Sequence, residues 1–270
     1  MNSKYITDAF EKFCGQSTKV YKTPVQTTAC EAFMNLKGAE TETQRVEVSD
    51  KPYLALIGTL LWALLTRLDV AYHVCFLCQF MADPTIECYE AAITVLSYLY
   101  STRKLGIVYK REEGPVKLSC YADASYGRSP HPVYGFVVYA NGVPIAWASK
   151  KMKIVPLSSC EAEVYAQNAA TKTLMWIRML LREFLASTPE LPMICYTDNE
   201  ATKETIEKPG VTARTKHFET WMQYCRERVL ALEIIMQWIP TADMLADIFT
   251  KCLDKTTFLK LRDVLLTEIG

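Results

Sequence analysis

Four acidic residues stand in local settings that favour metal chemistry. Asp123 and Asp198 each end a strand-like apolar run, Glu163 opens a long amphipathic stretch, and Asp247 lies in a short helical stretch after a third such run. Carboxylates at the ends of neighbouring strands and on the helices above them can converge, and their mutual repulsion would then raise their pKa values. Magnesium prefers oxygen ligands and removes this repulsion. Two such ions, about 3.5–4 Å apart, are the usual device for phosphodiester hydrolysis.

Each acid also has a structural alternative. Asp123 could close a turn at a strand end, and Asp198 or Asn199 could cap the helix that follows. Asp247 could be a solvated helix acid, with Asp243 the better first-turn acid. The prediction that these acids are catalytic groups and metal ligands therefore rests on the combination of Asp123, Glu163, Asp198 and Asp247.

Glu161 competes with Glu163 for a place in the site. The apolar stripe of the predicted helix contains Ala166, Ala170, Leu174, Ile177, Leu181 and Phe184. At about 100° per residue, Glu163 lies roughly 60° from Ala166 and Glu161 roughly 140° away. Glu163 is therefore expected to face the sheet, and Glu161 to face solvent or the helix N-terminus, where an acid suits the helix dipole.

Basic residues flank the acidic positions in two clusters. One cluster follows the third predicted strand and the other lies at the start of a longer helix, where backbone N–H groups can also face an anion. A solvated loop explains such clusters equally well, and phosphate contacts are the functional alternative. The candidate nucleic-acid contacts are Lys150, Lys151, Lys153, Asn199, Arg214, Lys216 and His217.

The second half of the chain alternates strands and helices. Asn141-Gly142 between two strand-like runs is a strong hairpin signal and predicts an antiparallel start to a sheet. The order β-β-β-α-β-α-β-α predicts an α/β fold, a mixed five-stranded sheet with helices on both faces. Predicted strands are Val116–Ala122, Tyr134–Ala140, Val143–Ser149, Met193–Thr197 and Leu232–Ile239, and predicted helices are Ser159–Ala186, Glu200–Glu207 and Ala213–Val229, with terminal helices from Ala242 and Thr256.

The first half is mainly helical in prediction. Residues 16–50 are polar and mixed and are expected to form a loop. The polar, turn-forming segment Arg111–Pro115 marks the boundary between domains 1–113 and 114–270. Predicted helices are Lys4–Cys14, Pro52–Arg67, Asp69–Met81 and Ile86–Thr102, followed by a short strand, Gly106–Tyr109.

Composition permits a well-packed protein without a strong charge. The 270 residues are 50% hydrophobic, and 30 basic residues balance 30 acidic ones. A dedicated nucleic-acid binder is usually basic, so only local patches can carry such a site. The ten cysteines, without a signal-peptide pattern, predict reduced thiols in an intracellular protein. The longest apolar run, Leu54–Leu65, is too short to span a bilayer, and no membrane partner is expected.

Several motifs come in an order that resembles the ribonuclease H domain of copia-type LTR retrotransposon polyproteins. From about Val116 onward they are Tyr121–Ser125, Ser158–Glu163, Tyr196–Asn199, Arg214–His217 and Leu245–Lys251. Three upstream segments resemble the thumb and connection region of the reverse transcriptase in the same polyproteins. They are Tyr53–Trp62, Thr66–Val70 and Phe80–Pro84.

The resemblance implies a ribonuclease H-like fold after a mainly helical thumb- or connection-like region. It implies a metal-dependent endonuclease that cleaves the RNA strand of RNA–DNA hybrids with two Mg²⁺ ions, for which Mn²⁺ can substitute. The implied partners are the hybrid and the palm and fingers of the parent polyprotein, and the implied locations are a cytoplasmic retroelement particle or the nucleus.

The sequence departs from the family pattern in three places. Pro130, His131 and Pro132 replace a Ser/Thr-rich stretch, and Val164 follows Glu163 where the family often has tyrosine. No adjacent aspartate pair of a polymerase palm occurs, so no polymerase activity is expected from this chain alone. One alternative is a degenerate, non-catalytic fragment that binds nucleic acid or docks on a polymerase. A strand transferase or integrase is disfavoured by the ending Leu245–Lys251.

Overall fold

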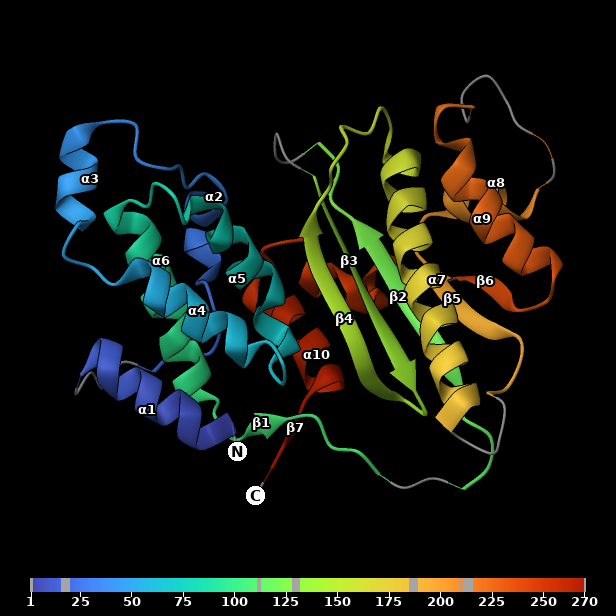
Figure 1. Cartoon of the computed structure of the whole chain (residues 1–270), viewed down its shortest axis with the longest axis horizontal. Helices are drawn as coiled ribbons and strands as arrows, with labels where there is room; N and C mark the ends of the chain where they lie inside the picture. The colour runs from blue at the N-terminus through green and yellow to red at the C-terminus, as the bar shows by residue number, and fades with distance from the viewer. Residues whose placement is uncertain are drawn as a thin grey trace. The chain divides into compact units, whose positions relative to one another are not determined.

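A computed structural model describes residues 2–15, 20–110, 113–127, 132–184, 189–208, 210 and 216–269. The chain forms two compact units (Figure 1). Unit 1 comprises Met1–Val108 and Cys252–Gly270, and unit 2 comprises Tyr109–Lys251. None of the helices in the described ranges is long and apolar enough to cross a membrane.

Unit 2 contains a five-stranded mixed sheet. Its strands are β2 (Leu118–Ala124), β3 (Val133–Ala140), β4 (Val143–Lys151), β5 (Met193–Thr197) and β6 (Ile234–Trp238). The order is β4-β3-β2-β5-β6, with β4, β3 and β2 antiparallel and β2, β5 and β6 parallel. The tight turn is built at Asn141 and Gly142, both of which have positive φ, as the hairpin signal predicts. The predicted mixed five-stranded sheet is confirmed.

Helices cover both faces of this sheet. α7 (Ser159–Phe184) lies along one face of β2 and β3 (Figure 1), where small residues such as Ala162 and Ala166 are fully buried. The short 3₁₀ segment η6 (Leu245–Phe249) also packs on these strands. Gly135 faces η6, whereas the next residue, Phe136, packs in the core beneath α7. Because successive side chains of a strand point to opposite faces, η6 lies on the face opposite α7. The remaining helical elements are α8 (Glu200–Glu207), η4 (Lys216–Phe218), α9 (Glu219–Leu230) and η5 (Thr241–Asp243).

Unit 1 is built mainly from helices. They are α1 (Asn2–Cys14), η1 (Thr27–Ala29), α2 (Cys30–Met34), α3 (Glu42–Val48), α4 (Tyr53–Ala63), η2 (Leu68–Val70), α5 (Ala71–Leu77), η3 (Cys78–Phe80), α6 (Ile86–Ser101) and α10 (Lys255–Leu265), and β1 (Leu105–Gly106) pairs with β7 (Thr267–Glu268). Residues 20–50 were expected to form a loop, which is wrong for η1, α2 and α3. The Thr41–Gln44 capping box that starts α3 is the local signal that polarity alone conceals.

The division of the chain also differs from the predicted domains 1–113 and 114–270. Residues 252–270 belong with the first part of the chain. The reason is aromatic packing by α10: the Phe258 ring lies edge-on to Tyr98 and His73, with ring centroids 5.8 and 6.3 Å away. A break in composition marks a turn, but it does not reveal that a later segment returns to the first core.

Several predicted element limits need correction. Strand β2 runs two residues beyond the predicted Ala122, so Asp123 lies inside the strand. The helix predicted from Ala242 is two short 3₁₀ segments, η5 and η6. The helix predicted over Ala213–Val229 begins as η4 and continues as α9, and its first three residues lie outside the described residues.

Candidate active site

The parallel pairing of β2 and β5 brings two of the acids together. Tyr121 of β2 is in register with Tyr196 of β5, and each acid follows two residues later, Asp123 within β2 and Asp198 just after β5. Parallel strands end at the same edge of a sheet. Asp123 is buried and Asp198 half-buried, which places both at the mouth of a cleft.

Glu163 joins them from the first turns of α7. Its carboxylate is buried, and one oxygen from each of Asp123, Glu163 and Asp198 lies within 4.8 Å of the other two. The alanine face of α7 allows this approach, because a helix with small side chains can pack close to a sheet. The three acids therefore form a compact, all-oxygen donor set.

Of the two alternatives for Glu161, solvent or the helix N-terminus, the structure shows the second. Glu161 is buried, and its carboxylate accepts hydrogen bonds from the Leu157 backbone at 2.6 Å and lies 3.0 Å from His217 Nε2. Ser158 Oγ in turn accepts from the Glu161 backbone N–H at 3.1 Å. Glu161 thus fastens the start of α7, a capping role, and leaves Glu163 as the acid that faces the other two.

Asp247 approaches the site by way of η6. Gly135 of β3 is in register with Asp123 and makes room for η6, since a Cβ at position 135 would lie 2.5 Å from Phe249 Cβ. Asp247 is buried but does not belong to the three-acid group among the described residues. It is connected to Asp123 through Lys251, whose Nζ lies 2.7 Å from Asp247 Oδ1 and 3.3 Å from Asp123 Oδ2.

Sequence reasoning missed Thr250 and Lys251 as parts of the site. The Thr250 hydroxyl donates a very short hydrogen bond to Asp123 Oδ2. Lys251 follows Asp247 by four residues, a spacing that pairs opposite charges on a helix. That spacing was a signal for the pairing of Lys251 with Asp247. The second contact of Lys251, with Asp123, joins residues 128 positions apart and leaves no such signal.

Burial and neighbouring charges raise the pKa of two acids of this site, Glu163 and Asp247. Burial, and then the charges of Asp123 and Asp198, raise the pKa of Glu163 well above its ordinary value, while Lys251 acts in the opposite direction. Burial, and then Asp123, raise the pKa of Asp247 to about 7. Burial alone would lower the pKa of Lys251, but Asp123 and Asp247 raise it. One ammonium group therefore does not neutralise the cluster, and its hard oxygen donors fit Mg²⁺.

Asp123, Glu163 and Asp198 line a cleft of about 490 Å³. Asn199 borders it and also caps α8, because its side chain accepts from the Thr202 backbone N–H at 3.0 Å. Asp198 is therefore not the helix cap. Trp238 Nε1 donates to the Asp198 carbonyl at 3.0 Å. The cleft is lined by Asp123, Ala124, Ser125, Tyr126, Ser159, Glu163, Asp198, Asn199, Glu200 and Lys251.

The predicted basic contacts are only partly brought to this cleft. Lys150 and Lys151 are exposed at the end of β4 and pair with Tyr134 and Val133 of β3, at the same end of the sheet as Asp123. Lys153 and Lys216 are exposed, and His217 is paired with Glu161. Of the six that the structure describes, only Asn199 lines the cleft. Arg214, like Pro130 and His131 of the altered loop, lies outside the described residues.

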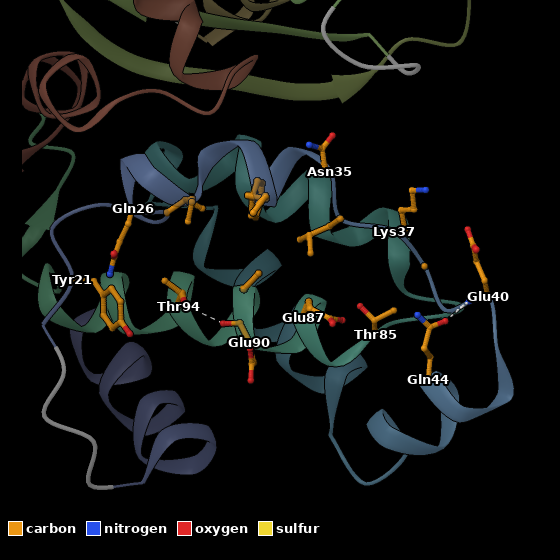
Figure 2. A pocket seen from close by; sticks show the side chains of 17 residues that line it. Tyr21, Gln26, Asn35, Lys37, Glu40, Gln44, Thr85, Glu87, Glu90 and Thr94 are labelled. Atoms are coloured by element: carbon orange, nitrogen blue, oxygen red, sulfur yellow. Dashed lines mark hydrogen bonds between the residues drawn. The ribbon is translucent and has the colours of Figure 1, made fainter.

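Unit 1 has a larger hollow of about 650 Å³ between α6 and the segment 21–44 (Figure 2). Phe33 and Val25 form part of its buried lining. Among its polar lining residues, the Gln44 side chain accepts from the Glu40 backbone N–H at 2.9 Å. Among the described residues, no group of metal-binding side chains occurs there.

No family model matches the chain. Over 209 residues, 76% of this chain and 14% of the relative, it is 33% identical to the retrovirus-related Pol polyprotein from transposon RE1 of Arabidopsis thaliana. Over 260 residues, 94% of this chain and 19% of the relative, it is 27% identical to the corresponding polyprotein from transposon TNT 1-94 of Nicotiana tabacum. The chain belongs to the Pol polyproteins of copia-type retrotransposons. It therefore spans less than a fifth of these relatives.

The copia-type assignment confirms the resemblance drawn from the motifs. Among solved structures, the N-terminal RNase H domain of a Mycobacterium tuberculosis protein aligns with 54% of this chain and 96% of that chain, at a TM-score of 0.37 and 16% identity. This alignment adds no weight to the assignment, which rests on the sequence relatives. Unit 2 holds the mixed sheet and the acidic cleft of this copia-type polyprotein segment, and unit 1 precedes and follows it in the chain.

Proposed function

We propose that unit 2 is a metal-dependent endonuclease that cleaves the RNA strand of RNA–DNA hybrids as part of a copia-type Pol polyprotein. The observation that supports this most is the group of carboxylate oxygens from Asp123, Glu163 and Asp198 within 4.8 Å of one another. Carboxylates this close repel one another, and a divalent cation with a preference for oxygen ligands offsets that repulsion. The retrovirus-related Pol polyproteins among its relatives support a nucleic-acid substrate.

The proposed cofactors are two Mg²⁺ ions, for which Mn²⁺ can substitute. Asp123, Glu163 and Asp198 would hold one ion, and Asp123 and Asp247 would contribute to the other. When bound, such ions lower the pKa of the attacking water and stabilise the leaving 3′-oxygen. The all-carboxylate donor set and the raised pKa values of Glu163 and Asp247 support a divalent cation at this position.

The chain's own groups orient these ligands. The Thr250 hydroxyl fixes Asp123, and Trp238 holds the backbone of Asp198. Glu161 and His217 fasten the start of the helix that carries Glu163. Fixed ligands reduce the reorganisation that the reaction would otherwise need.

The substrate would lie across the end of the sheet. Lys150 and Lys151 are exposed at the same end as Asp123 and would contact phosphates, with Lys153, Lys216 and Arg214 as further candidates. Selectivity for a hybrid would come from its minor groove, where the 2′-hydroxyls of the RNA strand are accessible. His217 is the weakest of these candidates, because Glu161 already engages it.

The biological setting is also part of the proposal. The palm and fingers of the parent polyprotein would be the partners of this chain, and a cytoplasmic retroelement particle or the nucleus would be its location. The copia-type relatives support this setting. No polymerase activity is expected from the chain itself, because it has no adjacent aspartate pair.

Cleavage by the full chain tests the proposal. Labelled RNA–DNA hybrid, duplex DNA and duplex RNA would be incubated with Mg²⁺ or EDTA, with hybrid cleavage expected only in Mg²⁺. Asp198→Asn should slow cleavage by about 10²–10³-fold or more, the usual effect of losing one electrostatic group. Glu204→Gln is the matched control, since Glu204 is an exposed acid paired with Lys208 on α8. A folded protein that binds hybrid without cleaving it would contradict the proposal.

A further inference from the structure

The four acids of the site form two overlapping groups. Asp123, Glu163 and Asp198 offer oxygens within 4.8 Å of one another, a ready three-ligand site for one cation. Asp247 stands outside this group and is engaged by Lys251. Asp123 belongs to both groups, because Lys251 Nζ also lies 3.3 Å from Asp123 Oδ2 and 3.4 Å from Asp123 Oδ1.

Lys251 stands between Asp247 and the open cleft. The lysine lines the cleft and Asp247 does not, although both belong to the same tight turn: the Lys251 backbone N–H donates to the Asp247 carbonyl at 3.1 Å. The Lys251 side chain is 20% exposed and that of Asp247 is 9% exposed. A cation that enters from solvent therefore meets the ammonium group before it meets Asp247.

We propose that Lys251 is the resident cation of the Asp123–Asp247 pair and keeps a second divalent ion out of the protein until nucleic acid is bound. This inference rests on the proposed function. Its physical basis is repulsion between like charges. A Mg²⁺ ion binds a carboxylate oxygen at about 2.1 Å, so an ion on Asp247 Oδ1 would lie less than about 5 Å from the ammonium in its present place.

Charge balance explains why the substrate would relieve this exclusion. With a divalent ion bound and all four acids ionised, the acids carry four negative charges, and Lys251 with that ion supplies three positive ones. A second divalent ion raises the total to five, which leaves an excess of positive charge. The single negative charge of a phosphodiester removes that excess, so the second ion binds together with the phosphate.

Counting bound ions tests the proposal without any measurement of activity. The full chain would be titrated with MnCl₂ by calorimetry and by the electron paramagnetic resonance signal of free Mn²⁺. We expect one ion per wild-type chain and two per Lys251→Met chain. Loss of a unit charge within about 5 Å should strengthen the second site at least about tenfold. Addition of a hybrid with a 2′-O-methylated RNA strand should bring the wild-type count to two, after subtraction of ions bound by the hybrid alone.

Three further variants make the result specific. Lys251→Arg keeps the positive charge and should keep the count at one. Lys203→Met removes a lysine that pairs with Glu207 at 2.6 Å on α8, also four residues apart, and should leave the count at one. Asp198→Asn should abolish the first ion. Circular dichroism of each variant shows whether it folds. Lys251→Arg shows whether the ion count depends on the positive charge at this position.

The outcomes are distinct. Two ions on the wild-type chain without nucleic acid, or a single ion on the Lys251→Met chain, would overturn the role of Lys251 and leave the nuclease intact. No Mn²⁺ bound by a folded wild-type chain would overturn the proposed metal-dependent function itself. One ion on the wild type and two on Lys251→Met, with no hybrid cleavage, would support the role of Lys251 and contradict the nuclease.

Discussion

Gly135 is the position at which a single methyl group should disturb the whole site. A Cβ there would lie 2.5 Å from Phe249 Cβ, 3.0 Å from Thr250 Cγ2 and 3.1 Å from the Phe249 carbonyl carbon. Ordinary contact begins near 3.4 Å, so in Gly135→Ala the η6 segment must retreat by roughly 1 Å. Overpacking of this kind typically costs about 1–3 kcal/mol of the free energy of unfolding.

The retreat would move the groups that surround Asp123. η6 carries Asp247, and the next two residues are Thr250 and Lys251, both in contact with Asp123. Because a displacement of about 1 Å can slow a reaction about 10²-fold, Gly135→Ala should reduce hybrid cleavage more than its loss of stability explains. The methyl group itself reaches no acid, so the effect passes through the position of η6.

Urea unfolding in Mg²⁺ and hybrid cleavage below the unfolding transition measure the two effects separately. Gly58→Ala is the matched control, because Gly58 lies within helix α4 and a Cβ there meets nothing within 4 Å. It should stabilise the protein by up to about 1 kcal/mol and leave cleavage unchanged. Wild-type stability and cleavage in Gly135→Ala would refute the claim that η6 needs a glycine beneath it.

Two further predictions concern buried charges. Asp247 has a folded-state pKa near 7, above its unfolded value, so in EDTA the free energy of unfolding should fall by a few kcal/mol between about pH 4 and 7. Urea titrations should show a smaller fall in the free energy of unfolding for the wild type in Mg²⁺ and for Asp247→Asn in EDTA. An equal fall in these two cases and in the wild type in EDTA would count against the prediction. In unit 1, Asp69→Asn should cost about 3–5 kcal/mol, because Asp69 is fully buried between Arg67 and Tyr98. Urea unfolding would measure this, with exposed Asp50→Asn as control, and a loss similar to that of the control would contradict it.

Local patterns in the sequence were sufficient for much of unit 2. The turn at Asn141 and Gly142 could be predicted because positive φ restricts which residues suit a two-residue hairpin. The choice of Glu163 over Glu161 as the acid that faces Asp123 and Asp198 followed from helical spacing. Spacing left two positions open for Glu161, solvent or the helix N-terminus, and the structure shows the second. Spacing gives an angle around a helix but does not show which other segment covers that angle.

Other features required contacts that local pattern does not encode. The capping box that starts α3 was masked by the polarity of its surroundings. The return of α10 to unit 1 depends on Phe258 packing with Tyr98 and His73, residues far away in the chain. A break in composition was therefore a poor guide to the limit of the second domain.

The sequence by itself determined the family, the order of the strands and main helices of unit 2, and which acids stand at the ends of neighbouring strands. Each of these depends on residue type and on spacing within one segment, and that information is local. Only the tertiary structure decided that Lys251 joins Asp123 to Asp247 and that Gly135 admits η6. These contacts exist because the folded sheet brings together residues more than a hundred positions apart in the chain. A repeating pattern within one segment cannot predict such contacts.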